Sequence, residues 1–231
     1  MDDLWRLTGE CVVGFARRGD GWPSGLPSVL SSLPGPVVVI GARYETSPVG
    51  PYLELSVAEP ARLGLRSGLC VTSMAVTSAP ARELCRQRWD LPADLASMSW
   101  SGEGEERSLV WEDRALVLRG RPKGPRLPLM APLRSLQTGP SGPLVIPRRL
   151  RARLRLAVVE LQVPATDRLA ALAGRHLGAV STGLSMVAHP PRRPAGLLSS
   201  IPLRVPHLGP GPEPAAATAT MTELRAYGSV G

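Results

Sequence analysis

The 231-residue sequence predicts a mainly β (α+β) protein, a single closed or nearly closed antiparallel β-barrel-like domain with a few short helices. Three observations lead to this expectation. Many short apolar runs end at Gly, Pro, Ser or Asp, one long segment alternates with a period of two, and only three segments have helical character. Because aromatic residues make up only 4% of the chain, we expect an aliphatic core.

Six short runs have the β-branched, apolar composition of strands. They span 9–15, 36–42, 51–58, 69–76, 107–112 and 114–120. Alternation in the third run separates two faces, with Tyr52, Glu54 and Ser56 on one and Leu53, Leu55 and Val57 on the other. Polar residues that point into a barrel mark its ligand face, so the first of these faces is a candidate cavity wall.

The clearest alternation runs through 148–163, which predicts one long, half-buried strand. Its apolar face would hold Leu150, Ala152, Leu154, Leu156 and Val158, and its opposite face Arg149, Arg151, Arg153 and Arg155. An arginine row can serve as an anion track. A solvated or subunit-facing side of the strand is the favoured interpretation.

Helices are predicted at 26–33, 78–89 and 165–174. A Ser can cap the second, and Thr166 and Gly174 fit the start and the end of the third. From about residue 209 the sequence is rich in Pro, Gly and Ala without periodicity, which predicts a disordered tail. We therefore expect one domain over 1–208 and a tail over 209–231.

The formal charge of +8 raises the question of nucleic-acid binding. The basic residues are scattered, all but Lys123 are arginine, and no helix-turn-helix, RNA-recognition or zinc pattern accompanies them. This distribution predicts no nucleic-acid partner. An arginine bias this strong is typical of a GC-rich coding sequence.

Cysteine and histidine spacing argues against a metal site. Cys11, Cys70 and Cys85 form no C-x-x-C pair, and the three histidines, His176, His189 and His207, suit no metal pair. We expect no metal, no cofactor and buried thiols in a reducing compartment. The first residues lack a secretory signal, and no run approaches 18 apolar residues, which predicts a cytoplasmic protein without a membrane partner.

Two stretches carry a family resemblance. "YETSPVGPYLEL" (44–55) and "VTSAPARELCRQRWDLPADLASMSW" (76–100) resemble the acetoacetate decarboxylase family, especially divergent members from GC-rich bacteria. The segment 201–210 resembles a closing strand of the same family. The resemblance implies a barrel with an interior cavity and, from the family's habit of assembling, a homo-oligomer.

Position by position, the resemblance implies a changed active site. Members of the family form an iminium between a lysine amine of lowered pKa and a ketone. Ala93 stands at that lysine and Asp94 at a second lysine. The remaining correspondences place Arg86 on the motif arginine, Gln87 on a glutamate, Trp89 on the aromatic, Pro92 on the proline before the lysine, Cys85 on a glycine and Glu54 near an active-site carboxylate.

These correspondences define the candidate site. The predicted catalytic residues are Glu54, Arg86 and Asp94, and the predicted substrate-binding residues are Tyr52, Gln87, Trp89, Pro92 and Ala93. Three of these residues have a structural alternative. Glu54 could face solvent, Arg86 could pair with a nearby acid, and Trp89 could be a core or cavity-wall residue.

Three functions follow. The first is a non-covalent enzyme of the lyase, hydratase or isomerase type, acting on a small keto acid or polyketide-like compound. The second is a non-catalytic member that binds a small carbonyl or carboxylate ligand or serves as an assembly subunit. The third is a decarboxylase that uses Lys123, although the flanking Pro122 and Gly124 favour a surface loop there.

Overall fold

The computed structural model describes residues 4–19 and 22–194. The predicted closing strand at 201–210, the domain boundary at 208 and the predicted tail lie outside these residues. The strands are β1 (Trp5–Ala16), β2 (Ser31–Ser32), β3 (Val37–Thr46), β4 (Tyr52–Leu63), β5 (Arg66–Val76), β6 (Ala93–Leu95), β7 (Met98–Ser101), β8 (Arg107–Trp111), β9 (Leu116–Pro122), β10 (Leu127–Gly139), β11 (Gly142–Gln162) and β12 (Gly174–Ala188). The helix is α1 (Ala79–Trp89), and two 3-10 turns span Glu112–Arg114 and Ala170–Leu172.

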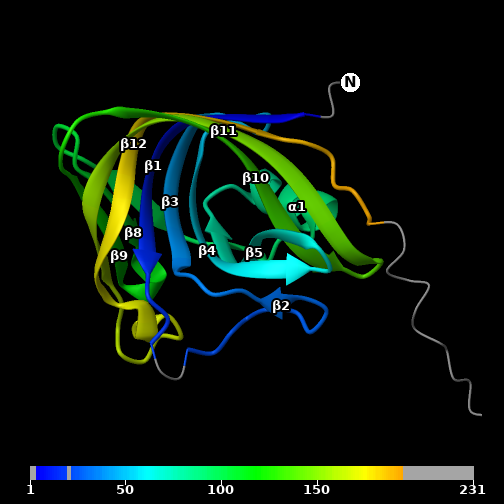
Figure 1. Ribbon diagram of the computed structural model, residues 1–231. Coiled ribbons are helices and arrows are strands. Elements are labelled where there is room, and N and C mark those ends of the chain that lie inside the picture. The colour runs from blue at the N-terminus through cyan, green and yellow to red at the C-terminus, as the bar shows by residue number, and fades with distance from the viewer. Residues whose placement is uncertain (1–3, 20–21, 195–231) are drawn as a thin grey trace, which may run out of the picture. The chain divides into compact units, whose positions relative to one another are not determined.

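Seven strands form a ring (Figure 1). Their order is β10-β5-β4-β3-β1-β12-β11, and β11 pairs again with β10. Every neighbouring pair is antiparallel except β5 and β10, which meet at one parallel bridge between Leu69 and Ser135. Strands β9, β8 and β7 continue the sheet from the far half of β11. The predicted mainly β, nearly closed architecture is confirmed.

The ring strands bury side chains on both faces. The inner cluster lies inside the ring and includes Leu7, Cys11, Tyr44, Tyr52, Met74 and Trp89. The outer cluster lies between the ring and β8–β9 and includes Val12, Val39, Leu55, Val57, Leu109, Leu118 and Val159. Because successive strand residues point to opposite faces, one strand supplies both clusters. The alternation predicted for 51–58 is the alternation found in β4.

In β11 the buried face changes midway, which corrects the predicted alternation. Leu150 and Leu154 pack against the inner cluster, as predicted. Leu156 is 55% exposed, while Ala157 and Val159 belong to the outer cluster. The second half of β11 pairs with β9. There the strand buries the face that the predicted alternation would expose to solvent. A single periodic pattern therefore cannot describe a 21-residue strand that serves two clusters in turn.

Helix α1 is the predicted helix at 78–89. The Ser78 hydroxyl accepts a hydrogen bond from the Ala81 N–H, and Asp90 ends the helix in a left-handed conformation. Its buried side chains are Ala81, Cys85 and Trp89, which recur every four residues. No helix in the described ranges is long and apolar enough to span a membrane.

The other two predicted helices are wrong. Segment 26–33 is a turn followed by β2, which pairs with β4, and the Leu33 N–H bonds the Pro60 carbonyl. Segment 165–174 holds only the 3-10 turn Ala170–Leu172. There the Asp167 carboxylate accepts the Leu169 N–H and pairs with Arg114, so side-chain bonds replace a helix. Tertiary contacts override weak helix propensity in both segments.

Candidate active site

The ring encloses a cavity of about 130 Å³ beside the inner cluster. Engineered cavities of about 150 Å³ bind benzene-sized molecules, so this space suits a small organic ligand. Most of its wall is apolar. The polar exceptions are Tyr44, Tyr52, Glu54, Ser56, Arg134, Ser135 and Arg148.

Strand β4 places Glu54 in the cavity wall. Tyr52, Glu54 and Ser56 all line the cavity, whereas Leu55 and Val57 point into the outer cluster. Only 8% of Glu54 is exposed. The prediction that this carboxyl faces an interior space is therefore met by its position.

The neighbours of Glu54 stabilise its charged form only in part. Burial raises the pKa of this carboxyl, because the charged form loses hydration. The positive charge of Arg148 and hydrogen bonds from Ser56 and Tyr44 act in the opposite direction without cancelling the effect of burial. Glu54 therefore keeps its proton to a higher pH than an exposed glutamate, as a group that exchanges protons with a ligand requires.

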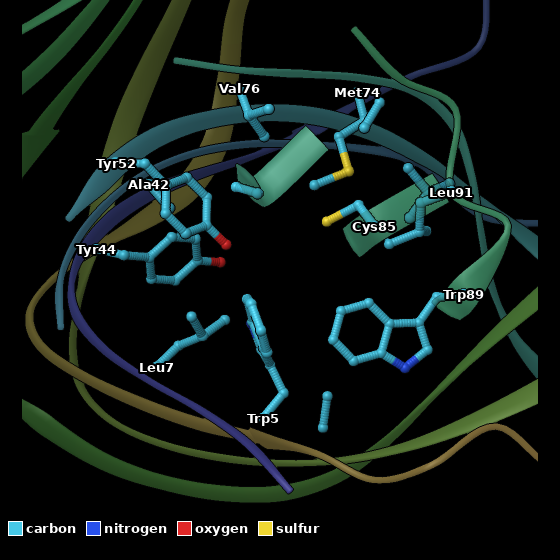
Figure 2. Close-up of a cluster of buried hydrophobic side chains, with 14 of the residues drawn as sticks. Trp5, Leu7, Ala42, Tyr44, Tyr52, Met74, Val76, Cys85, Trp89 and Leu91 are labelled. Atoms are coloured by element: carbon cyan, nitrogen blue, oxygen red, sulfur yellow. The ribbon is translucent and has the colours of Figure 1, made fainter. Parts of the chain in front are cut away.

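Two tyrosines stand beside Glu54. Tyr44 on β3 and Tyr52 on β4 are direct cross-strand partners, and their ring centroids lie 4.9 Å apart. Figure 2 shows both hydroxyls pointing into the same interior space. Burial, followed by the charge of Glu54, raises the pKa of both phenols. Both hydroxyls therefore remain protonated. Tyr44 donates its hydrogen bond to Glu54, and Tyr52 can donate one to a ligand oxygen.

Two further hydrogen-bond donors line the cavity. The Arg148 Nε on β11 and the Trp89 Nε1 at the end of α1 are buried and have no hydrogen-bond partner among the described residues. The Trp89 ring packs edge-on against Trp5 with centroids 5.4 Å apart (Figure 2). Buried N–H groups are usually satisfied, so these two donors without a partner are exceptions in the wall of the cavity.

Helix α1 and β6 present the other predicted residues to solvent. Arg86, Gln87, Pro92 and Asp94 are exposed and do not line the cavity. Arg86 and Gln87 follow the buried Cys85 by one and two residues, at 100° per residue, and so turn away from the ring. Of the predicted site residues, Tyr52, Glu54 and Trp89 line one pocket, and Arg86 and Asp94 do not.

Ala93 occupies a buried position next to the cavity. It is fully buried in β6 and is the register partner of Met74, which lines the cavity. Asp94 follows it in the strand and points the other way. The position matched to the catalytic lysine is thus close to the cavity, but it carries only a methyl group.

The only lysine of the sequence lies elsewhere. Lys123 is exposed in the connection after β9, where its N–H bonds the Leu156 carbonyl, and it is not part of the cavity wall. The thiol of Cys85 also lines the cavity. Burial raises the pKa of its thiol to about 12, with a further rise from Glu54, so the reactive thiolate is not formed near neutral pH.

Sequence reasoning missed Tyr44 and Arg148. Arg148 lies two residues before Leu150, so its parity already placed it on the apolar face of the alternating segment. Tyr44 lies within the quoted stretch 44–55, but its partnership with Tyr52 depends on the β3–β4 register. Within residues 4–19 and 22–194, no three His, Cys, Asp or Glu side chains are grouped to hold a metal ion.

Comparison with known proteins supports the fold alone. No family model and no curated protein matches the sequence. Solved structures match it, among them the enduracididine biosynthesis enzyme MppR complexed with pyruvate, at 16% identity and a TM-score of 0.58, covering 82% of this chain and 89% of that chain.

Two further matches are named after acetoacetate decarboxylase. Acetoacetate decarboxylase from Legionella pneumophila matches at 16% identity and a TM-score of 0.54, over 82% of this chain and 88% of that chain. An acetoacetate decarboxylase-like enzyme from Sphingomonas wittichii matches at 12% identity and 0.56, over 84% and 94%. The chain therefore has the acetoacetate decarboxylase-like fold that the motifs at 44–55 and 76–100 implied.

Proposed function

We propose that the protein is an acid–base enzyme that acts on a small keto acid or polyketide-like compound in the ring cavity, without a Schiff base. The observation that carries the proposal is Glu54, a buried carboxyl of raised pKa in an otherwise apolar cavity. Two protonated phenols and an arginine accompany it. Paired donors of this kind stabilise the oxygen of an enolate.

The reaction begins with proton transfer. The Glu54 carboxylate removes a proton from the carbon beside the substrate carbonyl, and the C–H electrons form the enolate double bond as the carbonyl electrons move to oxygen. The Tyr52 hydroxyl donates a hydrogen bond to that oxygen while Tyr44 holds the Glu54 carboxyl, and Arg148 pairs with the substrate carboxylate. Protonated Glu54 then returns the proton to carbon, giving exchange or isomerisation, or to a departing hydroxyl, giving water.

Schiff-base decarboxylation lacks its nucleophile here. Ala93 replaces the lysine of the family motif, and Lys123 is exposed. Related structures support a carbonyl carboxylate as the ligand class. MppR has been crystallised with pyruvate and with the condensation product of pyruvate and imidazole 4-carboxaldehyde.

Proton exchange tests the proposal directly. We expect the protein to speed the exchange of the methyl protons of pyruvate or the methylene protons of acetoacetate in D₂O, measured by ¹H NMR. Glu54→Gln keeps the shape of the side chain but removes the base, so the rate should fall by roughly 100- to 10,000-fold. Glu83→Gln is the matched control, because Glu83 is exposed on α1.

The two alternative functions give different results. If pyruvate binds saturably to both wild type and Glu54→Gln but neither catalyses exchange, the protein is a ligand-binding member of the fold, which the largely apolar wall would also suit. Incubation with acetoacetate or pyruvate, followed by borohydride and mass spectrometry of the protein, tests the Schiff-base decarboxylase. An adduct on Lys123 would contradict the proposal.

A further inference from the structure

The seam between β5 and β10 opens into a hollow that the proposed reaction does not use. Among the described residues, the backbones of these strands pair only at the Leu69–Ser135 bridge, and the Gln137 side chain adds a hydrogen bond to the Val71 carbonyl. Beside the bridge lies a space of about 690 Å³ lined by Ser67, Gly68, Leu69, Pro132, Leu133, Arg134, Pro147, Arg148, Arg149, His189 and Arg192. We name this space the vestibule. Figure 1 shows β5, β10 and α1 on the same side of the ring.

The vestibule adjoins the cavity. Leu69, Leu133, Arg134 and Arg148 line both spaces. Arg148 thus joins the two, because it lies in the wall of the vestibule and its charge acts on Glu54. A ligand that enters through the seam can place one end in the vestibule while its other end reaches Glu54.

The charge of the vestibule is of one sign. Its wall holds four arginines and His189 and no aspartate or glutamate. In the part of the chain that the structure describes, none of these four arginines forms an ion pair. A neighbouring hollow of about 300 Å³ adds Arg66 and Arg193 and shares Arg134 and Arg192 with the vestibule.

Several arginines outside the vestibule, by contrast, are paired with acids. Arg107, Arg114 and Arg126 each bind a carboxylate through at least one short hydrogen bond. Grouping like charges without counterions costs free energy through repulsion, and a concave surface of one sign concentrates the opposite ion. The vestibule thus has the electrostatic character of an anion-binding site.

We propose that the vestibule binds a phosphate or diphosphate group, and that the natural ligand carries such a group at the end remote from Glu54. One carboxylate is satisfied by a single bidentate arginine, which Arg148 already supplies beside the cavity. The other three arginines and His189 match an anion with two or more charges and several acceptor oxygens. The anion site itself does not depend on the acid–base role of Glu54.

Calorimetric titration with inorganic pyrophosphate tests the anion site. We expect wild type to bind pyrophosphate more tightly than acetate, and the double variant Arg149→Gln/Arg192→Gln to bind it at least about tenfold more weakly. Both side chains are exposed, lie outside the cavity wall and can be replaced without leaving a core void. Circular dichroism checks that the variant is folded.

The matched control is Arg62→Gln/Arg151→Gln, which removes the same charge from exposed positions outside the vestibule. It should change the affinity less than about twofold. An equal loss in both double variants would mean that net charge alone attracts pyrophosphate and would overturn the proposal. Unchanged binding in Arg149→Gln/Arg192→Gln would overturn it as well.

Two further binding measurements separate this proposal from the acid–base proposal and from nucleic-acid binding. Glu54→Gln should bind pyrophosphate as wild type does while losing proton exchange, so the anion site and the acid–base reaction can fail independently. A single-stranded oligonucleotide that bound more tightly than pyrophosphate, with the same sensitivity to Arg149→Gln/Arg192→Gln, would replace the small-molecule ligand with a nucleic acid and overturn the assignment.

Discussion

Glu54 and Glu10 expose similarly small fractions of their surface on opposite faces of one sheet, but Glu54 lies deeper, and their pKa values move in opposite directions. Burial acts to raise the pKa of both carboxyls. At Glu10, the hydrogen bonds and charge of Arg107, together with the charge of Arg43, outweigh burial and lower the pKa. At Glu54, burial prevails over Arg148.

The difference lies in geometry. Arg107 holds Glu10 through two hydrogen bonds of 2.9 Å, and the Trp100 Nε1 donates a third of 3.3 Å. A bidentate arginine fixes the carboxylate in its charged form and makes it a structural anchor. Among the described residues Glu54 forms no ion pair with an arginine within 4 Å, and it faces a cavity. Burial alone therefore does not distinguish a structural acid from a reactive one.

Packing differs between the two faces in the same way. In the outer cluster, a Cβ added to Gly41 would lie 3.1 Å from Leu118, and one added to Gly120 would lie 2.6 Å from Val180. The side chains thus pack directly against glycine backbone. The inner cluster leaves a cavity of about 130 Å³. The outer face is the more tightly packed of the two, and the inner face leaves open space.

The largest expected effect compares a leucine from each cluster. Leu55→Ala should lower the free energy of unfolding by about 3 to 5 kcal/mol, because Leu55 is fully enclosed in the outer cluster. Leu7→Ala should cost only about 2 kcal/mol, because Leu7 already borders the cavity and loses fewer contacts. Urea unfolding of both variants measures the difference, and equal losses would show that the two faces are packed alike.

The second comparison uses the two acids and pH. The pKa of Glu10 is lower in the folded protein, so its contribution to stability is complete above its unfolded pKa and is lost as the pH falls through the folded value. Glu10→Gln should therefore lower the free energy of unfolding by about 2 to 3 kcal/mol at neutral pH and by less in acid.

Glu54 should show the opposite sign. Its pKa is higher in the folded protein, so wild type loses stability as the pH rises from the unfolded pKa through the folded one. Glu54→Gln removes this loss and should gain stability relative to wild type toward alkaline pH. Urea unfolding between about pH 4 and about pH 8 measures both trends. Parallel pH profiles for the two variants would refute the contrast.

The smallest expected effect comes from adding methyl groups. Ala75 in the outer cluster faces Leu55 across the β4–β5 pair, and Ala75→Val should cost about 1 to 3 kcal/mol through overpacking. Ala58 lines the cavity, so Ala58→Val has room and should cost less than about 1 kcal/mol. The same variant should weaken pyruvate binding, measured by calorimetry. A larger stability loss at Ala58 than at Ala75 would contradict this view of the cavity.

Local patterns predicted the elements that local physics determines. The period of two in 51–58 correctly separated Glu54 from Leu55, and Ser78 correctly marked the start of α1. The helices at 26–33 and 165–174 were wrong because pairing with β4 and the Asp167 bonds determine those segments. The family motif placed Arg86 and Asp94 near the site, but the orientation of α1 and β6 turns both outward.

The sequence alone determined three things: the alternating strands, the cap of α1, and the absence of any lysine apart from Lys123. Only the tertiary structure decided which strand face encloses the cavity, that Tyr44 and Arg148 join Glu54 there, and that Arg107 neutralises Glu10. The physical reason is the separation along the chain between the residues that interact. Alternation and capping act between near neighbours in the chain, whereas the packing of β8 against β1 that joins Glu10 to Arg107 acts between residues nearly a hundred positions apart.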